Sequence, residues 1–483
     1  MLFNSFQFLV FFTCVFFTYF ALPHRWRWVL LLAASYYFYM CWKMEYVLLI
    51  IFSTVVDYVA GIQIERSATK KRRRLFLGMS LVANLGLLFF FKYYDFFSES
   101  VRTLFNQFNI CVDLPVFNAL LPVGISFYTF QTLSYTLDVY MGKRNAERHQ
   151  GIFALYVAFF PQLVAGPIER STHLMPQFRR IVRFDYDRVV SGLRLMLWGF
   201  VKKIVIADRL AWGVENAYLR PESATGLELS IATLFFAVQI FCDFSAYSDI
   251  AIGVARILGF DLMKNFRQPY TARSVSEFWR RWHISLSTWF KDYVYIPMGG
   301  NRNGRWRAYF NLAVVFLLSG LWHGASWTFV VWGALHAFYM LAERVLSESR
   351  IGKRRFENNR WLSGLAPCVQ VVFTFVLVCY AWIFFRASSF HDAWVISKRM
   401  GAGLLHLDRS VWEQLLHQPN SVLFGFVLVL FVLGVQLVQR WVDLGALFEK
   451  SPLFIRWGAY YMGVLVILLL GVLENDQFIY FQF

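Results

Sequence analysis

Long apolar runs recur along this chain of 483 residues, and they restrict its possible folds more than any other feature. An α-helix needs about 20 apolar residues to cross the hydrocarbon core of a bilayer. Because several runs are short and one is long enough to bend, we expect about 11 transmembrane helices. The runs are 3–22, 28–42, 45–61, 75–92, 152–168, 193–212, 229–256, 309–326, 327–345, 364–385, 421–438 and 455–473.

Two shorter apolar runs, 120–137 and 284–298, are expected to be re-entrant or interfacial, because such backbone must be covered by protein or line a cavity. The sequence thus predicts an all-α polytopic membrane protein that also has re-entrant and amphipathic helices. No internal repeat or low-complexity linker divides the chain, so we expect one membrane domain over 1–483. Its expected parts are N-terminal helices at 1–118, a catalytic core at 119–345 and C-terminal helices at 346–483.

The composition agrees with a chain dissolved in lipid, since 58% of its residues are hydrophobic and only 16% are charged. The net charge of +17 would also suit a nucleic-acid-binding protein, which needs a solvated basic face. Here the basic runs lie between apolar spans, which is typical of cytoplasmic loops. We therefore expect no nucleic-acid partner.

The basic run "ATKKRRR" (68–74) is the strongest cytoplasmic marker and predicts that residue 1 lies outside, three spans earlier. Two further basic segments, 169–188 and 264–308, are expected to be amphipathic helices and loops at the cytoplasmic boundary. Their charge indicates either orientation and contact with anionic lipids, or a mouth for a ligand that carries phosphate. Charge alone leaves both interpretations open.

No phosphate-binding loop, dinucleotide fingerprint, nucleophile elbow or H-E-x-x-H helix appears in the chain. The six cysteines form no C-x-x-C pair, so we expect buried free thiols and no metal. No permanently bound cofactor is expected either. Familiar nucleotide hydrolysis and serine-hydrolase chemistry therefore lack support from motifs.

A histidine inside an apolar stretch is the first candidate for chemistry: His323 in "LSGLWHGASW" (318–327). Ser319 would share its helix face. Gly320 and Gly324, which have no side chain, would allow a neighbouring helix or a narrow ligand to come close. Trp322 could wall a tunnel. Burial favours neutral imidazole, which can act as a general base, although a lone buried histidine is as often a structural hydrogen-bond donor.

Two other polar insertions interrupt apolar sequence. In "FCDFSAYSDIAIGVA" (241–255), Asp243 and Asp249 predict a network that ties helices together, which we favour. The alternative is a proton path or an acid that orients a histidine. In residues 277–305, His283 stands beside Arg280 and Arg281. At helical spacing Trp279, Trp282 and Leu286 form one stripe, which is more typical of core than of a ligand platform.

Five of these stretches together resemble the membrane-bound O-acyltransferase (MBOAT) family, above all its bacterial polysaccharide branch, which includes the membrane subunit of alginate O-acetylation. The likeness runs from "LLLAASYYFYMCW" (30–42) to "ENDQFIYFQF" (474–483). The motifs are "LPVGISFYTFQTLSYTLDVY" (121–140), "FFPQLVAGPIER" (159–170), "CDFSAYSD" (242–249), "NFRQPYTARSVSEFWRRWHISLSTWFKDYVYIPMGGNR" (265–302) and "LSGLWHGASWTFVVWGALH" (318–336).

The resemblance implies a ring-like helical fold with a central tunnel, in which His323 is the catalytic histidine and His283 a second, less essential one. Residues expected at the tunnel or the donor mouth are Trp322, Ser319, Gly320, Asp243, Asp249, Trp279, Arg280 and Arg281, while His336 is expected to be structural. The implied reaction moves acetyl from acetyl-CoA across the bacterial inner membrane to a periplasmic SGNH-type partner or a glycan hydroxyl.

Two alternatives use the same residues. A transporter or channel would employ the buried polar groups as a permeation path, but it would favour inverted repeats or paired broken helices, and neither is seen. A structural scaffold would leave three intramembrane histidines and the acidic residues without a role.

Overall fold

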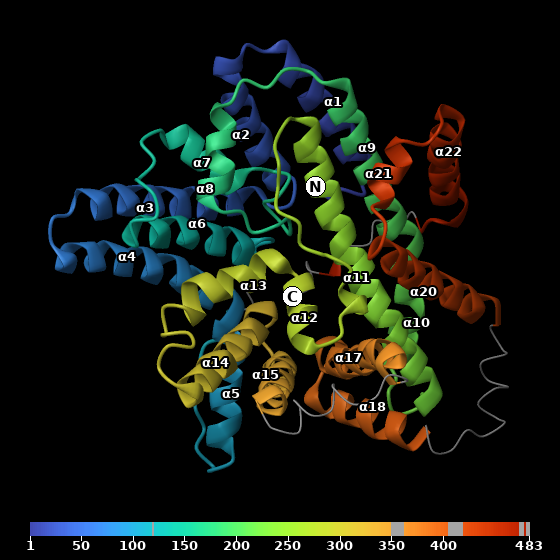
Figure 1. Ribbon diagram of the computed structural model, residues 1–483. Helices are drawn as coiled ribbons and strands as arrows, with labels where there is room; N and C mark the ends of the chain where they lie inside the picture. The colour runs from blue at the N-terminus through green and yellow to red at the C-terminus, as the bar shows by residue number, and fades with distance from the viewer. Residues whose placement is uncertain (118–119, 349–361, 404–418, 473–477, 480–483) are drawn as a thin grey trace. The chain divides into compact units, whose positions relative to one another are not determined.

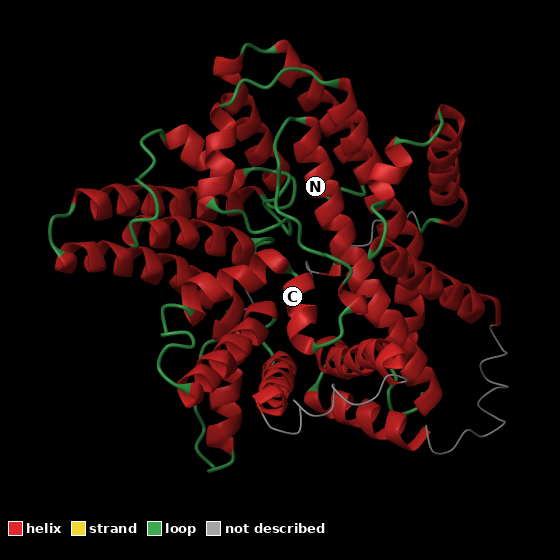
Figure 2. Ribbon diagram, in the orientation of Figure 1, coloured by secondary structure: helices red, strands yellow, loops and turns green. Residues whose placement is uncertain are grey.

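The protein is described by a computed structural model that covers residues 1–117, 120–348, 362–403, 419–472 and 478–479. Every regular element in those ranges is helical, as Figure 2 shows. This confirms the all-α prediction. Within the described ranges, seven helices are long and apolar enough to cross a membrane, so the total of about 11 stays a prediction. These are Met44–Arg66, Lys70–Asn106, Gly226–Ile257, Trp327–Glu348, Pro367–Arg386, Val422–Gln439 and Leu453–Leu470.

The helices fall into two compact units, the first built from Met1–Met196 and Tyr247–Met263, the second from Leu197–Ala246 and Lys264–Ile479. Two helices pass from one unit to the other along the chain: α9 (Tyr186–Phe200) and α11 (Gly226–Ile257). The remaining helices of the first unit are α1 (Phe6–Ala21), α2 (His24–Met40), α3 (Val47–Arg66), α4 (Lys70–Leu88), α5 (Tyr94–Asn106), α6 (Ile125–Tyr140), α7 (Gln150–Ala158) and α8 (Ser171–Leu174).

In the first unit, α3, α4 and α6 lie side by side (Figure 1) and share a buried polar centre. Asp57 accepts hydrogen bonds from Thr136 (3.1 Å), from the Asn84 amide (3.0 Å) and from Ser80. Polar contacts of this kind hold apolar helices together where the surrounding lipid offers no partner.

The expected span at 152–168 is wrong, because α7 ends at Ala158 and the chain continues as buried turns. Pro161 explains the early end, since the residues before a proline avoid helical geometry and its ring lacks an N–H. Phe160 N–H finds a partner in Ser35 Oγ (3.0 Å). The turns are covered by protein, as irregular backbone at membrane depth requires.

Basic loops that are distant in sequence meet in the first unit. Arg27 donates to the Val182 carbonyl (2.5 Å), and Arg73 donates to the Tyr140 carbonyl (2.6 Å). Two ion pairs join Arg148 to Glu65 and Arg179 to Glu147. The contact between Arg27 and Val182 thus joins two segments predicted to be cytoplasmic, 24–27 and 169–188, while the orientation of the N-terminus stays a prediction.

The second unit contains α10 (Asp208–Tyr218), α12 (Val275–Arg281), α13 (Ile284–Phe290), α14 (Arg305–His323), α15 (Trp327–Glu348), α17 (Leu362–Arg386), α18 (Phe390–Gly403), α20 (Pro419–Gln439), α21 (Leu444–Glu449) and α22 (Leu453–Leu470). Short 3-10 and π segments interrupt both units: η1 (Met44–Tyr46), η2 (Phe89–Tyr93), η3 (Met175–Arg179), η4 (Val201–Ala207), η5 (Pro269–Thr271) and η6 (Lys291–Tyr295).

Many apolar side chains on the long helices face outward, and α22 buries none of its residues. This outward apolar surface suits contact with lipid. The expectation of buried thiols is wrong for four of the six cysteines. Cys14, Cys41, Cys111 and Cys368 are exposed, and only Cys242 is fully buried.

Candidate functional site

His323 is the last residue of α14, and its side chain is buried. Gly324 adopts extended backbone and ends the helix, after which the chain turns and begins α15 at Trp327. Sequence alone predicted this division into two apolar segments. The histidine therefore lies at the turn of a helical hairpin.

Small residues allow the two helices of that hairpin to approach closely. A Cβ added at Gly320 would lie 3.1 Å from the carbonyl carbon of Phe329 and closer still to its oxygen. A Cβ added at Gly333 would meet the Phe316 carbonyl in the same way. Gly320 was predicted to allow the approach of either a helix or a ligand. The structure supports the helix, because Gly320 does not line the cavity described below.

His283 occupies an unusual backbone conformation between α12 and α13, with φ of +41° and ψ of +55°. Left-handed geometry costs a non-glycine residue about 1–2 kcal/mol, so its surroundings must hold it. Asn265 does this from the preceding loop: its carbonyl accepts from Ile284 N–H (3.0 Å) and its side chain from Ser285 N–H (3.3 Å). The sharp turn aims the buried imidazole inward, whereas helical periodicity predicted one continuous stretch.

The structure brings the two motif histidines together, with ring centroids 6.3 Å apart. Trp322 lies against both, at 5.7 Å from His283 and 5.0 Å from His323. Trp332 and Phe385 contact His323 at 5.1 and 5.2 Å. A wall of aromatic rings of this kind keeps bulk water from the imidazoles and lowers the local dielectric constant.

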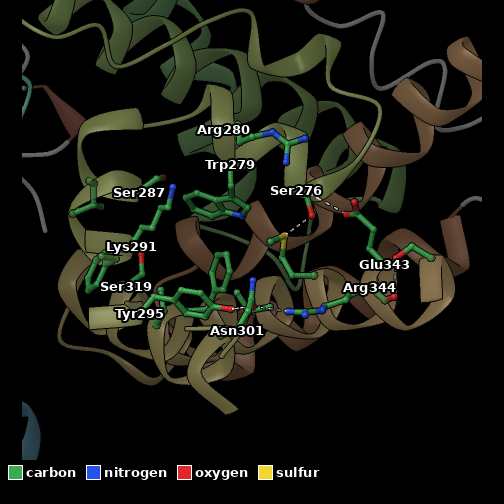
Figure 3. A pocket seen from close by; sticks show the side chains of 17 residues that line it. Ser276, Trp279, Arg280, Ser287, Lys291, Tyr295, Asn301, Ser319, Glu343 and Arg344 are labelled. Carbon is green, nitrogen blue, oxygen red and sulfur yellow. Dashed lines mark hydrogen bonds between the residues drawn. The ribbon is translucent and has the colours of Figure 1, made fainter. Parts of the chain in front are cut away.

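A cavity of about 590 Å³ opens in the same unit, and its wall includes Ser319, one helical turn before His323 (Figure 3). Its apolar side is formed by residues from α13 and α14, among them Leu286, Phe290 and Phe316. At its rim, Tyr295 and Arg344 both donate to the Asn301 side chain, at 2.5 and 3.3 Å. Its size lies within the roughly 300–1,000 Å³ of small-molecule sites.

Three cations line this cavity, namely Arg280, Lys291 and Arg344, against one carboxylate, Glu343. Arg344 is paired with a neighbouring glutamate, whereas Arg280 and Lys291 make no ion pair with any described residue. The cavity therefore combines an apolar interior with two cations available to a ligand, which suits an anion attached to a longer molecule.

The two neighbouring arginines of the "WRRWH" motif have different surroundings. Arg280 lines the cavity, as the donor-mouth prediction requires. Arg281 does not line it: its guanidinium is paired with Glu277 (2.5 Å) and donates to Thr271 (2.9 Å). Adjacent positions on a helix point about 100° apart, which explains why only one of them reaches the cavity.

Trp279 also lines the cavity, and its indole N–H donates to Nδ1 of His336 (3.2 Å). His336 is buried among Trp332, Phe278 and Phe316, and its Nε2 has no hydrogen-bond partner among the described residues. The tryptophan expected to be core is thus both packed and exposed to a cavity. His336 holds the Trp279 indole through this hydrogen bond, which agrees with the structural role predicted for that histidine.

Asp243 belongs to a buried ion-pair network in the second unit. One oxygen lies 2.9 Å from Lys203 Nζ, which also pairs with Asp208 at 2.7 Å, and the other accepts from Ile479 N–H at 2.8 Å. These contacts support the structural role that we favoured for Asp243, and none of them supports a position in the tunnel.

Asp249 lies in the part of α11 that belongs to the first unit. Of the motif 474–483, the structure describes only Phe478 and Ile479.

Four residues around these features were not singled out from the sequence. Lys291 was one basic residue among many, and Arg344 follows an apolar span in the position of an ordinary flanking charge. Trp332 precedes His336 by one turn, which is a weak signal that the two share a face. Phe385 comes from α17, and nothing in its local sequence indicates contact with His323.

Comparison with known proteins agrees with the motifs. The model of the MBOAT, membrane-bound O-acyltransferase family, matches residues 152–390. The chain is 40% identical over 396 residues to "Probable alginate O-acetylase AlgI" of Azotobacter vinelandii, covering 82% of this chain and 77% of that protein. It is 34% identical to the "Peptidoglycan O-acetyltransferase" of Helicobacter pylori, over 79% and 76% of the two chains.

A more distant similarity joins it to the "Teichoic acid D-alanyltransferase" of Bacillus subtilis, at 26% identity over 57% of this chain and 71% of that one. The two stronger matches extend over 82% and 79% of the chain at 40% and 34% identity, and the segment matched by the family model contains four of the five motifs quoted above. With its apolar helices, the chain is a multi-pass membrane O-acyltransferase. It belongs to the membrane-bound O-acyltransferase family.

Proposed function

We propose that this chain moves acetyl groups from cytoplasmic acetyl-CoA across the inner membrane for the O-acetylation of a polysaccharide. His323 is the general base and His283 assists it. The observation that carries the proposal is the buried histidine pair, with ring centroids 6.3 Å apart, in which His323 lies on the same helix as Ser319 of the cationic cavity's wall.

The class of acceptor follows from the relatives. Their names refer to alginate, peptidoglycan and teichoic acid, all of which are polymers of the bacterial envelope. Two of the three names specify acetyl transfer, and these belong to the more similar chains. An acetyl group on a polysaccharide hydroxyl is therefore the product that the family relationship supports best.

The cavity supports acetyl-CoA as donor. Coenzyme A carries phosphates on one end and a thioester on a long, slender arm. Arg280 and Lys291 would bind the phosphates, while the arm would follow the apolar wall toward Ser319. Interactions between arginine and phosphate are stronger than neutral hydrogen bonds, so a large part of the donor's affinity would come from this rim.

In the reaction, the acceptor hydroxyl attacks the thioester carbonyl as His323 removes its proton. The tetrahedral intermediate then collapses, the carbon–sulfur bond breaks, and the imidazolium returns the proton to the departing thiolate. The products are an acetyl ester and free coenzyme A, and His323 is again neutral. Trp322, Trp332 and Phe385 keep water away from the thioester, which limits its wasteful hydrolysis.

The acceptor on the far side is a periplasmic SGNH-type partner, which passes the acetyl group to the glycan, or the glycan hydroxyl itself. In this arrangement residue 1 lies outside and the basic loops of the first unit lie in the cytoplasm. The contact between Arg27 and Val182 supports that topology, because it joins two segments that are both predicted to be cytoplasmic, 24–27 and 169–188.

The test uses the full chain in proteoliposomes with acetyl-CoA labelled in the acetyl group. We expect release of free coenzyme A and appearance of label on a lumenal partner protein or glycan. A transporter would instead accumulate intact acetyl-CoA in the lumen and would leave the thioester uncleaved. Transport of that kind, with no acetyl ester formed, would overturn the proposal.

A further inference from the structure

The segment Arg180–Arg188, which follows η3 and includes the first residues of α9 in the first unit, lines a second cavity of about 550 Å³. The cavity is lined by this segment and by Gly259, and no residue proposed to bind the donor or to act in acetyl transfer contributes to it. Three arginines line it against one aspartate: Arg180, Arg183 and Arg188 with Asp185. The site therefore carries excess positive charge.

Two of these cations are available to a ligand. Arg180 and Arg183 are exposed, and their guanidinium groups make no hydrogen bond or ion pair with any residue that the structure describes. Arg188 is held more firmly, since it donates to the Arg183 carbonyl (2.6 Å). Asp185 offsets only one of the three positive charges, and its carboxylate accepts a hydrogen bond from the Arg188 backbone N–H (2.8 Å) at the start of α9.

Apolar side chains alternate with the arginines and face outward. Ile181 is 74% exposed and Phe184 is 57% exposed, whereas Val182 between them is buried. An exposed aliphatic chain and an exposed aromatic ring within four residues are unfavourable in water. They would be stabilised in the interfacial layer of a bilayer, where amphipathic segments place apolar groups below the headgroups.

Other contacts place this segment beside the ends of apolar helices. Phe184 contacts Phe20 and Phe16 near the end of α1, with centroids 5.6 and 6.5 Å away. Arg27, at the start of α2, donates to the Val182 carbonyl and lies over the Tyr19 ring. The segment therefore lies where a hydrophobic helix gives way to a basic turn, which is the depth of lipid headgroups.

We propose that the Arg180–Arg188 segment binds the phosphate headgroup of an anionic phospholipid, with Arg180 and Arg183 on the phosphate and Ile181 and Phe184 among the acyl chains. A free phosphate ion offers the same charge, but it gives no reason for the two apolar side chains to be exposed. The site would fix this face of the first unit to the lipid surface and would make the protein sensitive to phosphatidylglycerol content.

The experiment measures phosphatidylglycerol retained by the full chain, by native mass spectrometry after extraction from discs of phosphatidylcholine and phosphatidylglycerol in equal parts. Each arginine near an anionic surface contributes about 1 kcal/mol, which corresponds to about a fivefold change in affinity. We expect retention of phosphatidylglycerol to fall about fivefold in Arg180→Gln or Arg183→Gln, and about 25-fold in the double variant. Phe184→Ser should also weaken retention of the lipid.

The matched control is Arg148→Gln, which removes the same charge from a side chain already paired with Glu65 and should leave retention unchanged. Size-exclusion profiles and thermal unfolding establish that each variant is folded. Equal loss in Arg148→Gln would overturn the proposal, because retention would then follow net charge alone. Displacement of the lipid by millimolar inorganic phosphate, with Phe184→Ser behaving as wild type, would also overturn it in favour of a soluble anion.

Discussion

The close contact between α14 and α15 leads to a sharp prediction, because α14 carries His323 at its end. We consider Gly333→Ala, a change on α15 that adds one methyl group and touches neither histidine. The new Cβ would lie 3.1 Å from the Phe316 carbonyl carbon, 3.4 Å from Leu317 Cα and within 3.0 Å of the Phe316 oxygen. All three atoms are backbone, so no side-chain rotation can relieve the contact.

The helices must instead separate by more than about 0.5 Å before the new methyl group reaches ordinary contact distance. Overpacking of this kind costs about 1–3 kcal/mol of stability. A displacement approaching 1 Å at a catalytic group lowers the rate by about 100-fold. We therefore expect Gly333→Ala to lower kcat by one to two orders of magnitude while the KM for acetyl-CoA changes little.

The assay follows release of coenzyme A by purified protein in lipid discs, with folding monitored by size exclusion and thermal unfolding. Gly401→Ala is the matched control, because nothing lies within 4 Å of a Cβ added there. It should retain wild-type kcat. Full activity in Gly333→Ala, at normal stability, would refute the reasoning that the tight hairpin positions His323.

Other features of the second unit give further predictions. Arg280→Gln should raise the KM for acetyl-CoA about tenfold by removing a charged contact to phosphate, while Arg281→Gln leaves it unchanged because that side chain does not line the cavity. His336→Leu should raise the same KM several-fold by releasing the indole of Trp279, and His336→Asn should restore it, since the amide oxygen replaces Nδ1 as acceptor. Asp243→Asn should lower the free energy of unfolding by about 3 kcal/mol, because it leaves a buried ammonium with one carboxylate; an unchanged thermal midpoint would contradict the ion-pair network.

The sequence predicted the membrane class and most of the helices because apolar length is a local property. Where a proline intervened, the prediction failed: the run 152–168 was predicted to span the membrane, but Pro161 limits α7 to nine residues. The break at His283 was also missed, since its left-handed backbone is held by Asn265, a residue on a separate loop.

The site was predictable to the extent that it depends on motifs. Resemblance to a family assigned roles to His323 and His283, yet neither periodicity nor spacing could show that the two rings lie 6.3 Å apart. Contacts made across distant segments, such as Phe385 on His323, have no local signal. Likewise, the sequence around Gly320 was compatible with either a helix or a ligand as its neighbour, and only the position of α15 distinguishes the two.

The central claim is that His323 is the base that activates the acceptor hydroxyl. The most direct measurement is acetyl transfer from labelled acetyl-CoA to the lumenal acceptor by His323→Ala in proteoliposomes, compared with His391→Ala, a change at an exposed histidine in α18. General base catalysis contributes about 100- to 10,000-fold, so we expect a loss in that range for His323→Ala and none for the control. Acetyl transfer at the wild-type rate by folded His323→Ala protein would contradict the account.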